Sequence, residues 1–339
     1  MKIALSEKES RILVASQLRA NASITELQDE LGIPDYAIRR TIRRLIDQGV
    51  LAPRTLINVH PLGFDKAGVF FSLATGDPTK RQAALDFIGS LESVVSLYEL
   101  CGEHEFFAVL ATRGAMALAD TLSNIGENVE SFEQNAISIR ISLSLYQRTY
   151  LSAPQQERTF VRYHMTGEGV RVLPDDVAII GALDAHGVLS PAGVARLVNQ
   201  PVSSVAYRVA RLERHKVICG YLYHVRPAAL GLSSHHILIG CRNYGRKMHE
   251  KLHDFCMREP NVAVLAKCLG SWQFEMRVET GDTSELTALC SRIKRELGTD
   301  LIELKSHSIV REMRYMRSSF IRQASGALAE DGTTVKVAL

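Results

Sequence analysis

Apolar residues recur with helical spacing in three short segments at the start of the chain. The first segment opens with Ser6 and Glu9, a pair that predicts a capping box at a helix N-terminus. The second carries Ile24, Leu27 and Leu31 on one face. The third spans 34–51, so the opening part of the chain is predicted to be a compact unit of three helices.

The third segment, PDYAIRRTIRRLIDQGVL, is the most amphipathic of the three. At about 100° per residue, one face collects apolar side chains: Ile38, Ile42, Leu45 and Ile46. The opposite face collects arginines: Arg39, Arg40, Arg43 and Arg44. Pro34 suits the first turn of such a helix and Gly49 suits its C-terminal stop.

The second half of the chain repeats the first. Leu45 aligns with Leu212 at an offset of 167, and Gly102 aligns with Gly270 at an offset of 168. Three helical patterns recur at about 175–186, 190–198 and 201–215, and each triple is followed by a short strand pattern, at 55–60 and 220–225. A period of half the chain is too long for a solenoid repeat, so we interpret the chain as a duplicated two-part unit.

The second part of each unit alternates strand and helix patterns. In the first copy, strands are predicted at 69–75, 94–101, 106–112 and 137–145, with helices at 79–91 and 114–125. This order, β-α-β-β-α-β, is that of a ferredoxin-like domain. The predicted fold class is therefore α+β, with two copies of a winged helix-turn-helix followed by a ferredoxin-like domain. The predicted boundaries are 1–52 and 53–152 for the first copy, 153–173 for a linker, 174–219 and 220–318 for the second copy, and 319–339 for a flexible tail.

Composition adds a compartment but no partner. The chain has 46% hydrophobic and 23% charged residues, and no run reaches the roughly 18 apolar residues that span a bilayer. The opening MKIALSEKES is charged too early for a signal peptide, and six scattered cysteines fit a reduced compartment. We therefore expect a cytoplasmic protein with no membrane partner. The net charge of +3 divides into −3 for residues 1–160 and +6 for residues 161–339, which is too weak to name a nucleic acid.

The position of the arginines is more informative than their number. In a helix-turn-helix, the second helix of the pair enters the major groove of DNA, and arginine serves both phosphate and guanine contacts. The residues predicted to face DNA are Asp35, Tyr36, Arg39, Arg40, Arg43 and Arg44 in the first copy, and Ser203, Ser204, Tyr207, Arg208 and Arg211 in the second. The alternative is that these arginines only solvate a surface helix.

These features resemble the Lrp/AsnC, or feast/famine, family of regulators in a tandem-fused form. The resemblance rests on ITELQDELGIPDYAIRRTIRRLIDQGVL, the following HPLGF and the loop LCGEHEFF, and it covers nearly all of both halves. It implies a transcriptional regulator that binds double-stranded DNA, senses an amino acid or related small molecule, and oligomerises through its ferredoxin-like domains. It implies no enzymatic activity. The second copy departs from the family in its turn, Asn199-Gln200, where the first has Gly32-Ile33.

The loop at 102–106 is the predicted effector site. An amino acid ligand needs carboxylates for its ammonium group and a close backbone approach for its carboxylate. Gly102, Glu103, His104 and Glu105 offer these groups, together with Gly270 of the second copy. The alternative is a hairpin turn whose acidic side chains are solvated. The second copy, with Gly270-Ser271-Trp272-Gln273-Phe274, keeps neither carboxylate.

A second resemblance leads to another class of protein. Siroheme decarboxylases have a similar helix-turn-helix plus ferredoxin-like architecture and also occur as fused pairs. The resemblance implies that histidines and arginines hold a tetrapyrrole with several carboxylates, and His104, Arg113 and Arg140 are the candidates here. The loop at 102–106 keeps the glycine of the regulators, which favours the first reading.

Other chemistry finds little support. His249, His253 and Cys256 share a helical face, but no fourth zinc ligand lies nearby in the sequence. The chain has no GxxxxGK[ST], GxGxxG, GxSxG or HExxH motif. We therefore expect no metal site and no cofactor.

Overall fold

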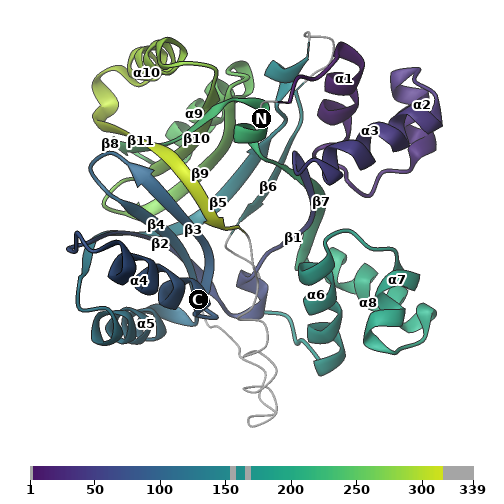
Figure 1. The fold of residues 1–339 in the computed structure, drawn as a ribbon, viewed down its shortest axis with the longest axis horizontal. Coiled ribbons are helices and arrows are strands. Elements are labelled where there is room, and N and C mark those ends of the chain that lie inside the picture. Colours follow the sequence, from purple (N-terminus) through teal and green to yellow (C-terminus); the bar gives the residue numbers. More distant parts are fainter. Residues whose placement is uncertain (1–2, 153–157, 165–168, 316–339) are drawn as a thin grey trace.

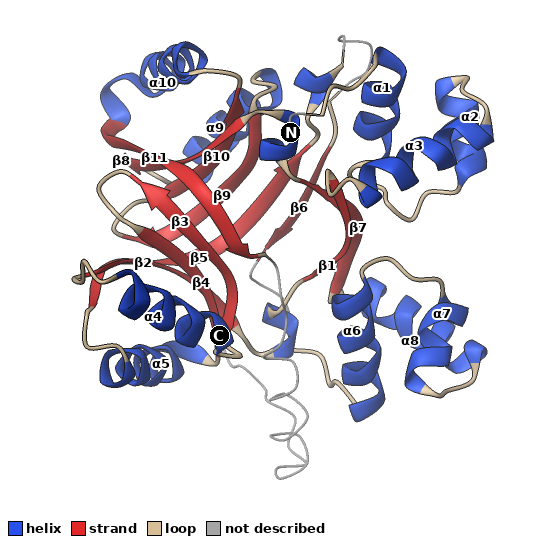
Figure 2. Cartoon of the chain, viewed as in Figure 1, coloured by secondary structure: helices blue, strands red, loops and turns tan. Residues whose placement is uncertain are grey.

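The computed structural model describes residues 3–152, 158–164 and 169–315. Two three-helix heads lie on one side of the molecule and a strand-rich body lies on the other (Figure 1). Helices cover the outside of the body, and its strands form the layer between them (Figure 2). The predicted α+β fold, with two copies of both parts, is confirmed.

The first head consists of α1 (Glu7–Ser16), α2 (Ile24–Leu31) and α3 (Asp35–Asp47). Capping boxes open α1 at Ser6 and α2 at Ser23. Gly32 ends α2 in the left-handed conformation, with φ of 64°, which allows the tight turn into α3. Ile38 and Leu45 are fully buried, so the apolar face of α3 packs inward as predicted.

The second head consists of α6 (Pro174–His186), α7 (Pro191–Val198) and α8 (Val202–Arg214). Asn199 takes the place of Gly32, with φ of 52°. Asparagine tolerates this left-handed conformation, so the turn survives the loss of glycine.

A short ribbon joins the two heads. Strand β1 (Leu51–Ile57) follows the first head and β7 (Ile218–Val225) follows the second, and the two strands pair with each other in antiparallel register. The strand that follows each head, the wing of its helix-turn-helix, therefore pairs with the wing strand of the other copy. This pairing could not be read from either half of the sequence alone.

The body is built from two ferredoxin-like units. The first contains β2 (Asp65–Leu73), α4 (Pro78–Ser90), β3 (Val94–Cys101), β4 (Phe106–Thr112), α5 (Gly114–Asn128) and β5 (Phe132–Tyr146). The second contains β8 (Ser233–Cys241), α9 (Arg246–Arg258), β9 (Val262–Gly270), β10 (Phe274–Thr280), α10 (Thr283–Leu297) and β11 (Leu301–Arg314).

The two sheets close on each other as a barrel. The strand order is β2-β4-β3-β11-β8-β10-β9-β5, and β5 pairs again with β2. The long strands β5 and β11 cross from one sheet to the other, because each pairs with both copies. The inner faces of the two sheets therefore enclose one shared interior.

Part of the segment predicted as a linker is structured. Strand β6 (Phe160–His164) pairs with the end of β5 and extends the sheet there. The tail predicted at 319–339 lies outside the described residues. No single helix in the described ranges is long and apolar enough to cross a membrane; α6 and α7, which meet at 112°, reach that length and composition only when they are taken together.

Candidate functional site

The inner face of the barrel is charged along one strand. In β10, Phe274, Met276 and Val278 pack outward into an apolar cluster with α9 and α10. The alternate residues Glu275 and Arg277, which face the interior, line a cavity, and Glu279 is fully buried. Because side chains alternate along a strand, FEMRVET places three charges in the protein interior.

Glu275 lies at the centre of this interior and is held by both copies. Its carboxylate accepts hydrogen bonds from Ser138 Oγ at 2.6 Å, from Arg140 at 2.5 Å and from Trp272 Nε1 at 3.1 Å. His236 Nε2 lies 3.3 Å away. Burial alone would raise the pKa of Glu275, but Arg140 and the hydrogen bonds from His236 and Ser138 hold it well below its usual range. Glu275 is therefore a carboxylate at neutral pH.

A second buried ion pair involves Glu279, which lies four residues after Glu275 on the same face of β10. Arg148 donates two hydrogen bonds to Glu279, at 2.7 and 2.8 Å, and Tyr150 donates a third at 2.5 Å. Arginine comes from the first copy and glutamate from the second, as in the Arg140–Glu275 pair. The first pair joins the halves of the chain inside the barrel, and the second joins them beside the first head, where Arg148 also donates a hydrogen bond to Gln17.

Between them, Arg277 connects the interior to the ribbon of the heads. Its guanidinium lies over the rings of Tyr98 and Tyr315, and it donates a hydrogen bond to Glu312 at 3.3 Å. His224 of β7 shares Glu312 at 2.9 Å. Although burial opposes ionisation, the contacts with His224 and Arg277 lower the pKa of Glu312 to about 2.

Lys66 differs from the other buried cations. It projects from β2 and is 5% exposed, and its ammonium reaches Tyr163 Oη at 3.4 Å. No acidic side chain among the described residues forms an ion pair with it. Burial, reinforced by the charge of Arg140, lowers the pKa of Lys66 to about 8. The charges of Cys219 and Asp184 oppose this shift without offsetting it. The ammonium thus lacks the close ion pair that buried charges normally require.

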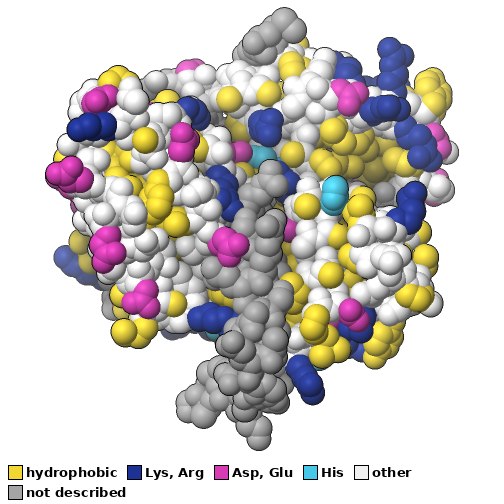
Figure 3. Space-filling model, turned by 60° about the horizontal axis from the view of Figure 1, so that its bottom comes forward, with side chains coloured by type: hydrophobic (Ala, Val, Ile, Leu, Met, Phe, Trp, Pro, Cys, Tyr) yellow, Lys and Arg dark blue, Asp and Glu magenta, His cyan; other side chains and the backbone are white. Residues whose placement is uncertain are grey.

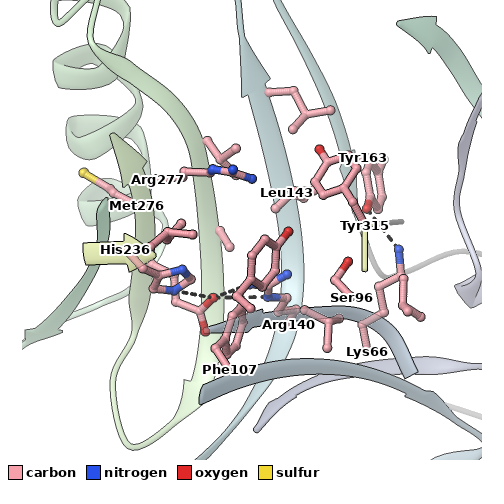
Figure 4. A pocket seen from close by; sticks show the side chains of 18 residues that line it. Lys66, Ser96, Phe107, Arg140, Leu143, Tyr163, His236, Met276, Arg277 and Tyr315 are labelled. Carbon is pink, nitrogen blue, oxygen red and sulfur yellow. Dashed lines mark hydrogen bonds and ion pairs between the residues drawn. The ribbon is translucent and has the colours of Figure 1, made fainter. Parts of the chain in front are cut away.

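Lys66 borders a cavity of about 70 Å³ (Figure 4). Its walls come from both sheets and include Ser96, Tyr98, Phe107, Arg140, Tyr163, His236, Arg277 and Tyr315. Beyond Tyr315 lies an open pocket of about 650 Å³, lined by Arg54, Asp86, His224, Arg226, Glu312 and Arg314, among others. Tyr315 lines both spaces and stacks on His224 with ring centroids 3.7 Å apart. A cationic outer pocket therefore adjoins the cavity that holds Lys66.

Three histidines, His104, His236 and His307, lie together around the ring of Phe70. His104 and His307 stack with ring centroids 5.1 Å apart, and both lie near Phe70 together with His236. Burial, and then the neighbouring His104 and His236, lower the pKa of His307 to about 4. Burial also lowers the pKa of His104 and of His236, so the neutral form of all three rings is favoured at pH 7. Nowhere in the described ranges do three or more His, Cys, Asp or Glu side chains form a group suited to a metal ion.

The residues predicted to bind an effector lie at the rim of this cluster. Glu103 is in ion-pair contact with Lys305 at 2.8 Å, and Glu105 with Arg81 at 3.2 Å. Gly102 lies so close to His307 that a Cβ there would be 2.7 Å from its ring. Gly270 lies against the backbone of Ile137 in a similar way. His104, by contrast, is buried inside the barrel.

The residues predicted to contact DNA are arranged differently in the two heads. In the first head, Tyr36 is 71% exposed, Arg40 and Arg43 are exposed, and Arg39 pairs with Asp35 on the helix surface. Arg44 turns back to Glu9 of α1. The first head therefore presents a cationic surface, as the sequence predicts, although DNA binding itself stays a prediction.

In the second head, two of the predicted arginines are engaged inside the head. Arg208 bonds to Asp175 at 2.7 Å and to Asp176 at 3.0 Å, and Arg211 bonds to Asp176 at 2.5 Å. The offset of 167 explains this, because it aligns Arg208 with Thr41 on the buried face of α3. Ser203 and Tyr207 are exposed, and Ser204 is half-buried.

The remaining candidates are dispersed. Arg113 lies over the ring of Phe64, away from the cavity. His253 is bonded to Tyr146 at 2.7 Å, and Cys256 is buried in the core under α9. Of the three residues suggested by the second resemblance, the structure brings only His104 and Arg140 into the barrel interior.

Comparison with known proteins adds two likenesses, while no protein-family model matches the chain. The HTH-type transcriptional regulator LrpA of Pyrococcus horikoshii is 29% identical over 124 residues, which are 35% of this chain and 84% of LrpA. The crystal structure of the siroheme decarboxylase NirDL covers 96% of this chain and 100% of its own, with a TM-score of 0.61 and 13% identity. Its complex with an iron-uroporphyrin III analogue covers 96% and 98%, with a TM-score of 0.59 and 13% identity.

These likenesses correct one expectation from the sequence. The chain contains Lrp/AsnC-like domains, and its two-copy fold is shared along nearly its whole length with an enzyme. The expectation that the chain has no enzymatic activity is therefore wrong, because the same architecture is that of the siroheme decarboxylase. It relied on the loop at 102–106 and on the outward arginines of the third helix, and it missed the charged interior, which comes from strands.

The sequence did contain a signal for that interior. FEMRVET alternates apolar and charged residues as strictly as a surface strand does, and SSHHIL places two histidines in β8. A surface strand and a strand that faces a polar interior have the same alternation. Only the closure of the barrel shows that Glu275, Arg277 and His236 face a polar interior and not solvent.

Proposed function

We propose that the chain is a decarboxylase of the siroheme type, which binds a tetrapyrrole bearing several carboxylates and removes carboxyl groups from it. One observation carries the proposal: Lys66 is a buried ammonium that forms no ion pair with any described acidic side chain, at the edge of a cavity that adjoins a cationic pocket. A carboxylate of the substrate would supply the missing anion. The fold shared with NirDL supports the same reading.

The two adjoining spaces suit the two parts of such a substrate. The inner cavity of about 70 Å³ has room for one carboxylate side chain and not for a macrocycle. The outer pocket of about 650 Å³ is within the size range of pockets for drug-sized ligands, roughly 300–1,000 Å³. We assign the macrocycle to the outer pocket, where Arg54, Arg226 and Arg314 would face its other carboxylates. Tyr315 and His224 stand between the two spaces and would have to move aside for a side chain to enter.

The chemistry requires one proton and no redox partner. When an acetate side chain loses CO₂, the bond between its methylene carbon and its carboxyl carbon breaks, and the electron pair stays on the methylene carbon. A proton then converts this group to methyl. Lys66, with a pKa of about 8, is mostly protonated at pH 7 and is a better acid than an ordinary lysine. The structure thus offers both the charge that holds the reacting carboxylate and a proton donor.

The test is anaerobic incubation of the purified protein with siroheme, followed by mass spectrometry of the tetrapyrrole. Loss of CO₂ from siroheme is the expected result. Lys66→Met keeps an unbranched side chain of similar shape without the ammonium and should reduce turnover by about 100-fold or more, as loss of a general acid does. The matched control is Lys80→Met on the exposed surface of α4, which should leave turnover unchanged. If the folded wild type neither shifts siroheme absorbance nor releases CO₂, the proposal fails.

A second candidate function rests on the exposed arginine face of α3. We propose that the first head binds double-stranded DNA, with Arg40 and Arg43 free in solvent and Tyr36 beside them. An amino acid effector at 102–105 is less well supported, because Glu103 and Glu105 already pair with Lys305 and Arg81. A mobility shift with DNA upstream of the gene, over a salt series, tests this. Binding that weakens steeply with salt and is lost in Arg40→Ala/Arg43→Ala is expected.

A further inference from the structure

The first head contains a groove whose apolar floor neither proposed function uses. The groove has a volume of about 360 Å³ and lies between the three helices and the ribbon. Its floor is formed by half-buried and buried apolar side chains: Ala22, Ile24, Leu27, Ile42, Ile46 and Tyr223. Tyr223 belongs to β7, so the second copy supplies one wall of a groove in the first head.

The groove is held in a fixed shape by backbone contacts. The amide of Tyr223 donates a hydrogen bond to the carbonyl of Gln17 at 2.8 Å, and the amide of Ala20 donates one to the carbonyl of Tyr221 at 3.0 Å. These bonds join the end of α1 and the residues after it to β7, beside the groove. The apolar floor is therefore part of the folded head and not a gap between loosely associated parts.

Three arginines line the groove: Arg19, Arg39 and Arg43. Arg19 pairs with Glu30 and Arg39 with Asp35. Arg43 forms no ion pair within the described part of the chain, so its charge is available to a ligand. On the space-filling surface, apolar side chains gather on the side of the heads with Lys and Arg side chains around them (Figure 3).

The second head does not reproduce this arrangement. At the offset of 167, Arg39 and Arg43 correspond to Ala206 and Ala210, so the two cations are missing. Ile46 corresponds to Glu213, which accepts a hydrogen bond from Tyr221 at 2.7 Å. A polar contact therefore replaces one apolar position of the floor there. The combination of floor and rim is particular to the first head.

We propose that this groove binds an amphiphilic carboxylate, such as a medium-chain fatty acid. The alkyl chain would cover the apolar floor and the carboxylate would pair with Arg43 at the rim, so each part of the ligand meets a surface of its own kind. The volume lies in the range of small-molecule sites, roughly 300–1,000 Å³. Because Arg39 and Arg43 also belong to the predicted DNA surface, an occupant would compete with DNA.

The test is isothermal titration of the full-length protein with decanoate, alongside decanol and decyltrimethylammonium. Decanoate should bind with one site per chain and more tightly than either comparison compound. Arg43→Ala should weaken decanoate binding by about tenfold or more, the value of one charge-assisted hydrogen bond. Arg40→Ala, which removes a neighbouring exposed arginine outside the groove, should leave affinity unchanged.

A variant that fills the groove separates this site from any other. Ala22→Phe places a ring on the floor and should abolish decanoate binding while the far-ultraviolet circular dichroism stays that of the wild type. The proposal is overturned if decanol binds as tightly as decanoate, if Arg43→Ala and Arg40→Ala behave alike, or if no binding is detected. None of these outcomes depends on siroheme turnover, so the groove and the decarboxylase proposal fail separately.

Discussion

Strands β4 and β10 occupy equivalent places in the two copies, yet they present opposite surfaces to the barrel interior. At the offset of 168, Phe107, Val109 and Ala111 of β4 correspond to Glu275, Arg277 and Glu279 of β10. Their outward residues are apolar in both strands. The two copies therefore share the apolar face that packs each sheet against its helices, and they differ in the face that points into the barrel.

This divergence makes the barrel interior asymmetric, which it could not be in a symmetric pair of identical chains. In both buried bridges between the copies the arginine comes from the first copy and the carboxylate from the second: Arg140 with Glu275, and Arg148 with Glu279. A homodimer with the same fold would carry each residue twice, related by its axis. One fused chain instead builds a single interior in which Lys66 forms no ion pair with the described acidic side chains, and its equivalent in the second copy is Ser234.

The largest expected effect comes from breaking one of these bridges. Arg148→Met leaves Glu279, which is 0% exposed, without its bidentate partner. Removing one member of a buried pair costs about 3–5 kcal/mol. Chemical denaturation should show this loss. Arg148→Met/Glu279→Met should recover most of it, because the double variant leaves no uncompensated charge; equal stability of the single and double variants would mean that the bridge does not join the copies energetically.

A stabilising effect is expected at the unpaired ammonium. The pKa of Lys66 falls from 10.5 to about 8 on folding, which corresponds to a penalty of about 3 kcal/mol. The unfolded chain holds this proton up to a higher pH than the folded chain does. The penalty is therefore full below pH 8 and disappears as the pH rises toward 10.5.

Lys66→Met should consequently be more stable than the wild type at pH 7 and equal to it near pH 10.5. The gain should accompany the loss of siroheme turnover, which is the signature of a group kept for function at the expense of stability. Thermal unfolding across this pH range measures it. A less stable Lys66→Met at pH 7 would show that the ammonium is satisfied within the barrel and would remove the main support for the proposed substrate.

The stacked His104 and His307 should make the free energy of unfolding sensitive to acid, by an amount similar to or smaller than the effect at Lys66. His307 takes up a proton near pH 6.5 when unfolded and only near pH 4 when folded. The free energy of unfolding should therefore fall as the pH drops through this window, by about 3 kcal/mol at most. His307→Phe, which keeps a ring against His104, should flatten the slope, whereas replacing the exposed His215 with Asn should not. An unchanged slope in His307→Phe would assign the acid sensitivity to other groups.

The sequence was sufficient for the fold but only partly for the site. The offsets of 167 and 168, the capping boxes and the strand patterns predicted both copies, since these signals are local. The site depends on closure of the barrel, which brings Lys66 of β2 and Arg277 of β10 to one cavity across more than half of the chain. Helical spacing also placed Arg208 among the DNA candidates, because it could not foresee Asp175 and Asp176 on the neighbouring helix.

The smallest effects should distinguish the two heads. Arg208→Ala removes two hydrogen bonds to acidic side chains, one of them to the fully buried Asp176, and should cost about 1.5–3 kcal/mol of stability. Arg43→Ala removes an exposed side chain with no ion pair among the described residues, so its stability should change by less than about 0.5 kcal/mol. In a DNA-binding assay the order should reverse, with Arg43→Ala losing affinity and Arg208→Ala, tested at a temperature where it is folded, keeping it. Equal losses of DNA affinity in both variants would mean that the ion pairs of the second head open to reach DNA, and that the heads differ in their resting state and not in their use.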